Sequence, residues 1–188
     1  YALAEVAVHE GASVVLVSGP TNLSNPAGVN RVDIVSAADM HAAVLAEAGA
    51  ADIFVAAAAV ADYTPRVVAD TKIKKNDTQL NLTLERTRDV LAEVAALSAP
   101  PFTVGFAAET NDVEANAIGK LERKRLNMIA ANQVGAGQGF HVDVNALSVF
   151  WAGGSTAIPL APKREIAQAL WKLIVERFEA TNSSHVSG

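Results

Sequence analysis

The sequence contains no cysteine, few aromatic residues and no long apolar run. Without cysteine the chain can form neither disulfide bonds nor thiolate metal sites, and it has no cysteine nucleophile. No window approaches the roughly eighteen consecutive apolar residues of a membrane span, and the start lacks the charged-then-apolar pattern of a signal peptide. These absences predict a soluble protein and fit a reducing cytoplasm.

Positive charge is also scarce. The 188 residues include 15 Lys and Arg against 20 Asp and Glu, and the net charge of −5 argues against general binding to nucleic acids or anionic membranes. Hydrophobic residues make up 51% of the chain and aromatic residues only 5%, so alanine, valine, leucine and isoleucine must build the core. Such a core is typical of a layered α/β protein, in which alanine-rich helices lie close to a sheet.

Strand and helix patterns alternate along the chain. Apolar and β-branched runs typical of strands occur at 13–18, 31–35, 53–61, 102–106 and 127–131, and a strictly alternating run at 80–85 predicts a strand with one solvated face. Helices are expected at 1–11, 36–50, 89–97, 113–126 and 163–178, the second with Ser36 as its N-cap. Two further runs straddle Gly153-Gly154 and predict a β-hairpin over 146–160.

This order predicts a Rossmann-like, doubly wound, mostly parallel sheet with a C-terminal β-hairpin extension. We expect a single domain over 1–179 and a disordered tail over 180–188. A doubly wound fold usually opens with a strand and a glycine-rich turn, whereas residues 1–11 have a helical pattern. We therefore expect a first strand and a Gly/Ser loop upstream of Tyr1.

The apolar run at 53–61 ends at Asp62. A buried parallel strand would place this carboxylate at the edge where open α/β sheets bind ligands. The alanines Ala56–Ala59 leave room for a backbone or a flat ring to approach. The other interpretation of Asp62 is a turn-capping aspartate.

Two groups of lysines are candidates for phosphate binding. Lys72 and Lys74 flank Ile73 in a polar segment, and lysine suits phosphate oxygens and a pyrophosphate leaving group. The alternative is an ordinary solvated charge run. Lys120 and Lys124 share a helix face, where two like charges are unfavourable unless an anion lies between them. The alternative for this pair is a solvated helix face.

Five stretches in the same order resemble the phosphopantothenate–cysteine ligase domain of the bacterial bifunctional coenzyme A biosynthesis proteins. They are Ala58–Tyr63, Lys72–Lys75, Gly105–Thr110, Lys120–Lys124 and Ala131–Val134, and the resemblance covers Tyr1 to about Phe178. It implies a ligase for which CTP is the co-substrate and Mg²⁺ the metal. CTP would activate the carboxylate of 4′-phosphopantothenate as an acyl-cytidylate, and the amine of cysteine would then displace CMP. The resemblance also implies a cytoplasmic homodimer, or a larger oligomer if a flavoprotein decarboxylase domain is fused upstream.

The resemblance assigns roles to individual residues. Lys72 would be the catalytic lysine, stabilising charge while the carboxylate attacks the α-phosphate. Lys120 and Lys124 would bind the triphosphate. The remaining nucleotide contacts would be Ala56, Ala57, Ala58, Asp62, Asp89, Val90, Leu91 and Phe106. Family residues that handle the acyl intermediate lie upstream of Tyr1, outside this sequence.

The chain departs from the family pattern in two places. Thr87-Arg88-Asp89 stands where the family usually has Asn-Pro-Asp, so only Asp89 carries over, and Asn127 replaces a common aspartate. Glu109 and Thr110 could serve magnesium or cap the next helix, and the metal ligands remain unknown.

Two other functions stay open. The crossover pattern is generic, so a nicotinamide-dependent oxidoreductase is an alternative, as is a non-catalytic nucleotide-binding or assembly module. The four histidines lack metal-ligand spacing, and no Walker loop is present. The hairpin at 146–160 and the strand at 80–85 need partners, and another subunit could provide them.

Overall fold

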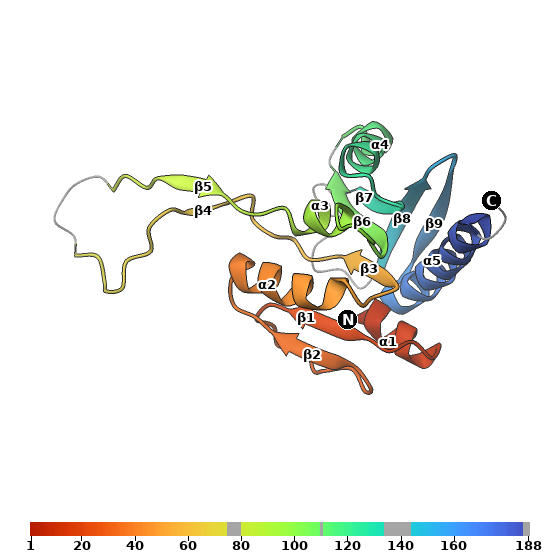
Figure 1. Cartoon of the computed structure of the whole chain (residues 1–188), viewed down its shortest axis with the longest axis horizontal. Helices are drawn as coiled ribbons and strands as arrows, with labels where there is room; N and C mark the ends of the chain where they lie inside the picture. The colour runs from red at the N-terminus through yellow and green to blue at the C-terminus, as the bar shows by residue number, and fades with distance from the viewer. Residues whose placement is uncertain (75–79, 110, 134–143, 186–188) are drawn as a thin grey trace.

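A five-stranded mixed sheet forms the centre of the structure, a computed structural model that describes residues 1–74, 80–109, 111–133 and 144–185 (Figure 1). Its strands, in spatial order, are β3 (Ile53–Ala56), β6 (Phe102–Glu109), β7 (Met128–Gln133), β8 (Val144–Trp151) and β9 (Gly154–Pro162). The first three are parallel, and β8 and β9 form an antiparallel hairpin on the far side of β7. The Rossmann-like α/β fold and the C-terminal hairpin are confirmed.

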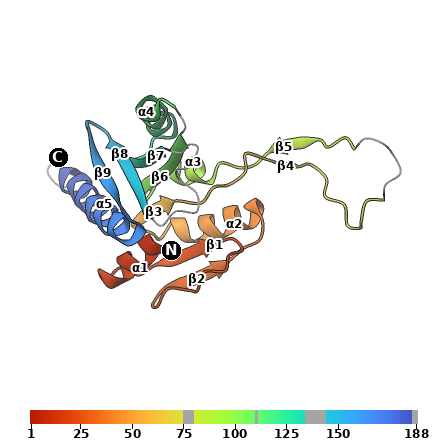
Figure 2. The ribbon, with the colours of Figure 1, turned by 180° about the vertical axis from the view of Figure 1, so that it is seen from behind.

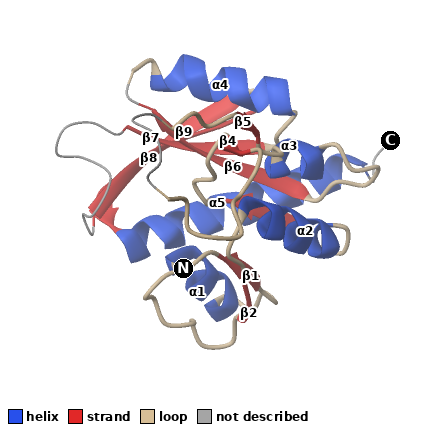
Figure 3. Cartoon of the chain, turned by 90° about the vertical axis from the view of Figure 1, so that its left-hand side faces the viewer, coloured by secondary structure: helices blue, strands red, loops and turns tan. Residues whose placement is uncertain are grey.

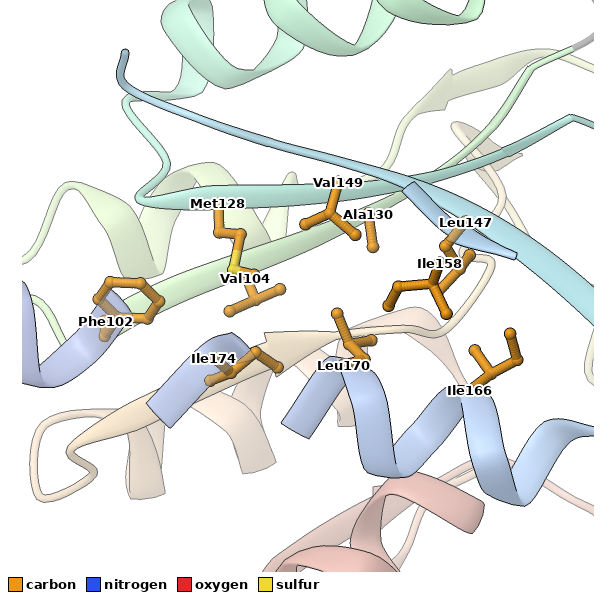
Figure 4. Close-up of a cluster of buried hydrophobic side chains, with 10 residues drawn as sticks. All are labelled: Phe102, Val104, Met128, Ala130, Leu147, Val149, Ile158, Ile166, Leu170 and Ile174. Atoms are coloured by element: carbon orange, nitrogen blue, oxygen red, sulfur yellow. The ribbon is translucent and has the colours of Figure 1, made fainter. Parts of the chain in front are cut away.

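Helices cover both faces of this sheet (Figure 3). On one face α5 (Lys163–His185) presents Ile166, Leu170 and Ile174 to the sheet (Figure 4). The sheet residues that meet them are Phe102, Val104, Met128, Ala130, Leu147, Val149 and Ile158. On the other face α4 (Val113–Lys124) packs Ala117 and Leu121 against the intervening strand positions. Alternate residues of a strand point to opposite faces, so β6 and β7 serve both layers.

Helix α5 corrects one expectation. Its pattern predicted an end at 178 and a disordered tail from 180, but the helix continues to His185. The hydroxyls of Thr181 and Ser183 each donate to a carbonyl four residues earlier, at 2.9 Å. These side chains therefore remain compatible with a helix despite their polar character. Residues 186–188 lie outside the described ranges.

A second, smaller parallel sheet pairs β1 (Val15–Ser18) with β2 (Asn30–Asp33). Helix α1 (Ala2–His9) precedes it and contacts α5, and α2 (Ala37–Ala48) follows it and packs on β1. Ser36 caps α2 as predicted, because its Oγ accepts from the N–H of Asp39 at 3.1 Å, and the Asp39 carboxylate accepts from the N–H of Ser36 at 2.8 Å. Among the described residues β1 and β3 each have one edge without a strand partner. A strand upstream of Tyr1 stays a prediction.

A narrow two-stranded arm extends from the body (Figures 1 and 2). It consists of β4 (Tyr63–Pro65), β5 (Leu84–Arg86) and the described residues between them, 66–74 and 80–83. The run at 80–85 was expected to bury one face, but Leu80, Leu82 and Leu84 are 63%, 61% and 53% exposed. The leucines of this run therefore alternate as predicted, but the body of the chain does not bury them.

The central apolar run is also shorter as a strand than expected. β3 ends at Ala56, and Ala57 begins a connection that leads into the arm at Tyr63. Neighbouring β6 continues to Glu109 by pairing with β7, but β3 pairs with β6 only as far as Gly105.

Within the described ranges, no helix is long and apolar enough to cross a membrane.

Candidate nucleotide-binding site

Several of the residues predicted to bind a nucleotide lie at the carboxyl end of a parallel strand or directly after it. β3 ends at Ala56, which pairs with Gly105 of β6. Ala57 and Ala58 follow and are exposed, as a backbone contact surface requires. This edge is where ligands bind in open α/β sheets.

Gly105 allows α3 (Val90–Ala95) to approach β6 closely. A Cβ at Gly105 would lie 2.9 Å from Cδ1 of Leu126 and 3.0 Å from Cδ2 of Leu91, closer than packed carbon atoms tolerate. The absent side chain thus makes room for Leu91, one of the predicted site residues. Leu91 packs on the α4 side of the sheet, while Val90 packs toward α2.

Lys120 pairs with Glu109. The Lys120 Nζ lies 2.6 Å from Oε1 of Glu109, whose side chain is only 13% exposed. Glu109 ends β6 and lies two residues after Ala107, which packs in the α4-side core, so its carboxylate faces α4. The sequence left Glu109 unassigned. The available signal was its position two residues after a core-facing strand residue, on the face that the next helix covers.

Lys124 pairs with Asp89. The Lys124 Nζ lies 2.7 Å from one carboxylate oxygen of Asp89 and 3.0 Å from the other. The same carboxylate caps α3, because it accepts from the N–H of Ala92 at 3.1 Å. Asp89 therefore links the start of α3 to the last turn of α4.

The pKa of Asp89 reflects this double role. Partial burial alone would raise the pKa of the carboxyl group. The hydrogen bonds from Lys124 and Ala92, with the charges of Lys124 and Arg123, outweigh burial and hold the pKa below its usual value. Asp89 is thus an anion at neutral pH.

Lys120 and Lys124 lie one turn apart on α4, as predicted, and each already has a carboxylate partner from another element. The pairs account for two like charges on one helix face without a bound anion. An ammonium group has three N–H donors, so each lysine can keep its carboxylate and still donate to a phosphate oxygen. Because two carboxylates balance the two lysines, a triphosphate would need further positive charge.

Phe106 lies on a different face from the lysines. Its side chain packs against the α5-side core, since residues 102, 104 and 106 of β6 share that face. A nucleotide near α4 could therefore meet the backbone of Phe106 but not its ring.

Asp62 and Lys72 lie at different positions along the arm. Asp62 is exposed at the base of the arm, where its carbonyl accepts from the N–H of Thr87 at 3.0 Å. This contact places Asp62 beside the segment that leads to Asp89. Lys72 is exposed on the segment between β4 and β5, which extends away from the body (Figure 1). The structure thus gathers the α3 and α4 residues and does not bring Lys72 to them; Lys75 and Thr110 lie outside the described residues.

Metal ligands are not evident at this edge. Among the described residues there is no group of three His, Asp or Glu side chains that could hold a metal ion.

A groove of about 700 Å³ between α4 and the β8–β9 turn is lined partly by Ile118 and Trp151. It lies at the opposite end of the sheet, because Trp151 pairs with Met128 at the start of β7, and none of the predicted site residues lines it.

The chain is similar in sequence to known proteins. The family model described as DNA/pantothenate metabolism flavoprotein C-terminal domain matches residues 1–178. The coenzyme A biosynthesis bifunctional protein CoaBC of Vibrio cholerae is 52% identical over 181 residues, which cover 94% of this chain and 45% of that protein. The protein of the same name from Escherichia coli is 46% identical over 187 residues, covering 97% and 46%.

A solved structure agrees with these relatives. The crystal structure of the C-terminal domain of a CoaBC protein matches with a TM-score of 0.80 and 38% identity, over 96% of this chain and 82% of that one. The chain spans about half the length of the curated relatives it matches.

Proposed function

Because the chain belongs to the DNA/pantothenate metabolism flavoprotein C-terminal domain family, and its relatives are coenzyme A biosynthesis proteins, we propose that it is a CTP-dependent phosphopantothenate–cysteine ligase. The observation that carries the proposal is the pair of lysines on one face of α4, each fixed by a carboxylate of another element: Glu109 at the end of β6 and Asp89 at the start of α3. Such an edge suits a nucleotide triphosphate.

The proposed reaction has two steps. An oxygen of the 4′-phosphopantothenate carboxylate attacks the α-phosphorus of CTP, and pyrophosphate leaves. The cysteine amine then attacks the acyl carbon, CMP leaves, and the amine loses a proton as the amide forms. The first step is needed because a carboxylate is a poor electrophile, and a mixed anhydride supplies a leaving group.

Each lysine has a distinct role in this scheme. Lys120 and Lys124 bind the triphosphate with the donors that Glu109 and Asp89 leave available. Lys72 stabilises the charge that develops as pyrophosphate leaves, once a ligand or a second copy has brought it to the site. Asp62, Ala57 and Ala58 meet the rest of the nucleotide at the base of the arm.

Magnesium enters this scheme with the nucleotide. The described residues offer no cluster of three ligands, and Mg²⁺ in nucleotide sites is commonly held by phosphates with one or two carboxylates. We therefore treat the MgCTP complex as the substrate. The two positive charges of Mg²⁺ add to those of the two α4 lysines, which Glu109 and Asp89 already balance.

A second copy of the chain is part of the proposal. The arm exposes a series of large apolar side chains: Tyr63, Val67, Val68, Ile73, Leu80, Leu82 and Leu84, each more than half exposed. Exposed apolar surface of this kind marks an interaction site. A homodimer with paired arms would cover these side chains, and each arm would carry its Lys72 toward the partner's site.

Calorimetric titration of the chain with MgCTP, MgATP and NAD tests the nucleotide. We expect CTP to bind more tightly than ATP, and NAD to show no binding. Equal or stronger ATP binding would refute the CTP preference, and tight NAD binding would favour the oxidoreductase alternative.

Turnover requires a second assay. The chain, extended upstream by the predicted strand and Gly/Ser loop, should form the amide from 4′-phosphopantothenate, cysteine and CTP with release of pyrophosphate. CTP binding without pyrophosphate release or amide formation would instead indicate the non-catalytic nucleotide-binding module.

A further inference from the structure

A hydrogen bond between the side chains of α2 and α3 lies outside the residues assigned so far. Nε2 of His41 in α2 is 2.8 Å from Oε2 of Glu93 in α3. The His41 side chain is 13% exposed and that of Glu93 38% exposed. Arg88 Nη1 lies 3.4 Å from the same histidine nitrogen, but a nitrogen that donates to Glu93 cannot also accept from Arg88. Arg88 Nη1 also lies 3.9 Å from Oε2 of Glu93, so this carboxylate has His41 as its closer partner and Arg88 as a more distant one.

Helix α3 depends on such contacts. It has six residues, and an isolated helix of that length is not stable in water. Val94 is fully buried against Val44 and Ala48 of α2, which anchors one face of α3. At its first turn, α3 is held by polar contacts on two sides: Asp89 to Lys124 of α4, and Glu93 to His41 of α2.

The two polar contacts are one helical turn apart. The N–H of Glu93 donates to the carbonyl of Asp89 at 3.0 Å, so Glu93 closes the turn that Asp89 opens. Displacing Glu93 would therefore displace Asp89, and with it the carboxylate that holds Lys124. This turn therefore connects His41 to the nucleotide site.

We propose that His41 and Glu93 are positioning residues, which fix the first turn of α3 so that Asp89 keeps Lys124 oriented toward a bound triphosphate. This inference rests on the proposed function for its ligand, but the positioning can be measured without any nucleotide. It predicts that the two residues act as one unit, and that their loss affects a triphosphate more than a monophosphate.

Titration of variants with CTP and CMP tests the effect on binding. His41→Ala and Glu93→Ala should each raise the Kd for CTP about threefold to tenfold, and the double variant should add little, because contacting residues are coupled. The Kd for CMP should change less, since CMP lacks the β and γ phosphates. Glu93→Gln keeps an acceptor of the same length and should recover part of the loss. Glu47→Ala, an exposed glutamate on the last turn of α2, is the matched control and should leave both constants unchanged.

Amide hydrogen exchange of the nucleotide-free chain tests the positioning itself. Exchange over residues 89–95 should accelerate in His41→Ala and in Glu93→Gln, a mild change at a partly exposed position, and stay at the wild-type rate in Glu47→Ala. Unchanged exchange in both His41→Ala and Glu93→Gln, or equal losses of CTP and CMP affinity, would overturn the inference. If exchange accelerates in the variants but the wild-type chain does not bind CTP, the result supports the positioning role of His41 and Glu93 and refutes CTP as the ligand.

Discussion

The two groups of predicted phosphate-binding lysines differ in how firmly the fold holds them. One group lies at an edge of the body, where Lys120 and Lys124 of α4 meet Glu109 and Asp89, and the other lies on the β4–β5 arm. At the edge, Lys120 and Lys124 are partly buried and each lies within 2.7 Å of a carboxylate oxygen. On the arm, Lys72 is exposed, and the two strands that support it have three residues each. Folding thus orients one group of lysines but leaves the other to be oriented by a ligand or a second copy.

This difference suggests a division of labour in the proposed reaction. Lysines held before the substrate arrives contribute to ground-state binding at little entropic cost. A lysine on a projecting arm must be brought to the site, so its main contribution should be to a later step. The predictions below test this contrast.

The largest effect is expected for Lys72→Gln. In a chain with the predicted upstream strand, pyrophosphate release in the absence of cysteine should fall by about 10²–10³, the usual loss when one group that stabilises transition-state charge is removed. CTP should bind within about tenfold of wild type, or roughly 1.4 kcal/mol. Rapid-quench measurement of pyrophosphate and calorimetric titration check both parts. Arg66→Gln, which removes an exposed positive charge from the same arm, is the control. Normal pyrophosphate release with failed amide formation would move Lys72 to the second half-reaction, and normal rates in both would make it a solvated charge.

Next in size is the effect of an apolar arm residue on assembly. Burying a leucine side chain contributes about 1.5–3 kcal/mol, so Leu82→Ser should weaken the proposed dimer markedly. Sedimentation velocity across a concentration series measures the change. Leu160→Ser is the matched control, since Leu160 is a 69% exposed leucine of the body, on β9. Equal weakening by both variants, or none by Leu82→Ser, would contradict an arm-mediated dimer.

A smaller effect is expected at the edge of the body. Lys124→Ala should weaken CTP binding by about 1–3 kcal/mol, because it removes a donor to a charged phosphate, and should weaken CMP binding less. Arg123→Ala, its exposed neighbour on α4, is the control. An equal loss for both nucleotides would mean that Lys124 acts on the fold through Asp89 rather than on the β and γ phosphates.

The smallest effect concerns the pH dependence of stability. Because the folded state lowers the pKa of Asp89, its contribution is fully present above the ordinary aspartate value of about 3.9 and is lost as the pH falls through the lowered pKa. The group is half exposed, so this contribution should be less than about 1 kcal/mol. Urea unfolding between pH 2 and pH 7 should show a steeper acid decline for wild type than for Asp89→Asn. Identical slopes would show that the Lys124 contact does not stabilise the fold.

The sequence determined the local features whose causes lie within a few residues. Ser36 caps α2 because its hydroxyl and the Asp39 carboxylate are three residues apart, the spacing of a capping box. Gly153-Gly154 separates two apolar runs, and the hairpin turns there, with Gly153 at a φ of 81° that favours glycine. The 120/124 spacing likewise put two lysines on one helix face.

Tertiary structure decided the outcomes that depend on distant partners. The alternating run at 80–85 matches a half-buried strand, but its pattern cannot show that the body offers no face for it, and within a single chain the arm stays solvated. Likewise, apolar character continues to Ala61, yet β3 ends at Ala56, five residues earlier, where its pairing with β6 stops. Glu109 meets Lys120, and His41 meets Glu93, because strand and helix packing brings together residues that are 11 and 52 positions apart. Periodicity specifies which side of an element is apolar, whereas the identity of the neighbour on that side is set only when the layers pack.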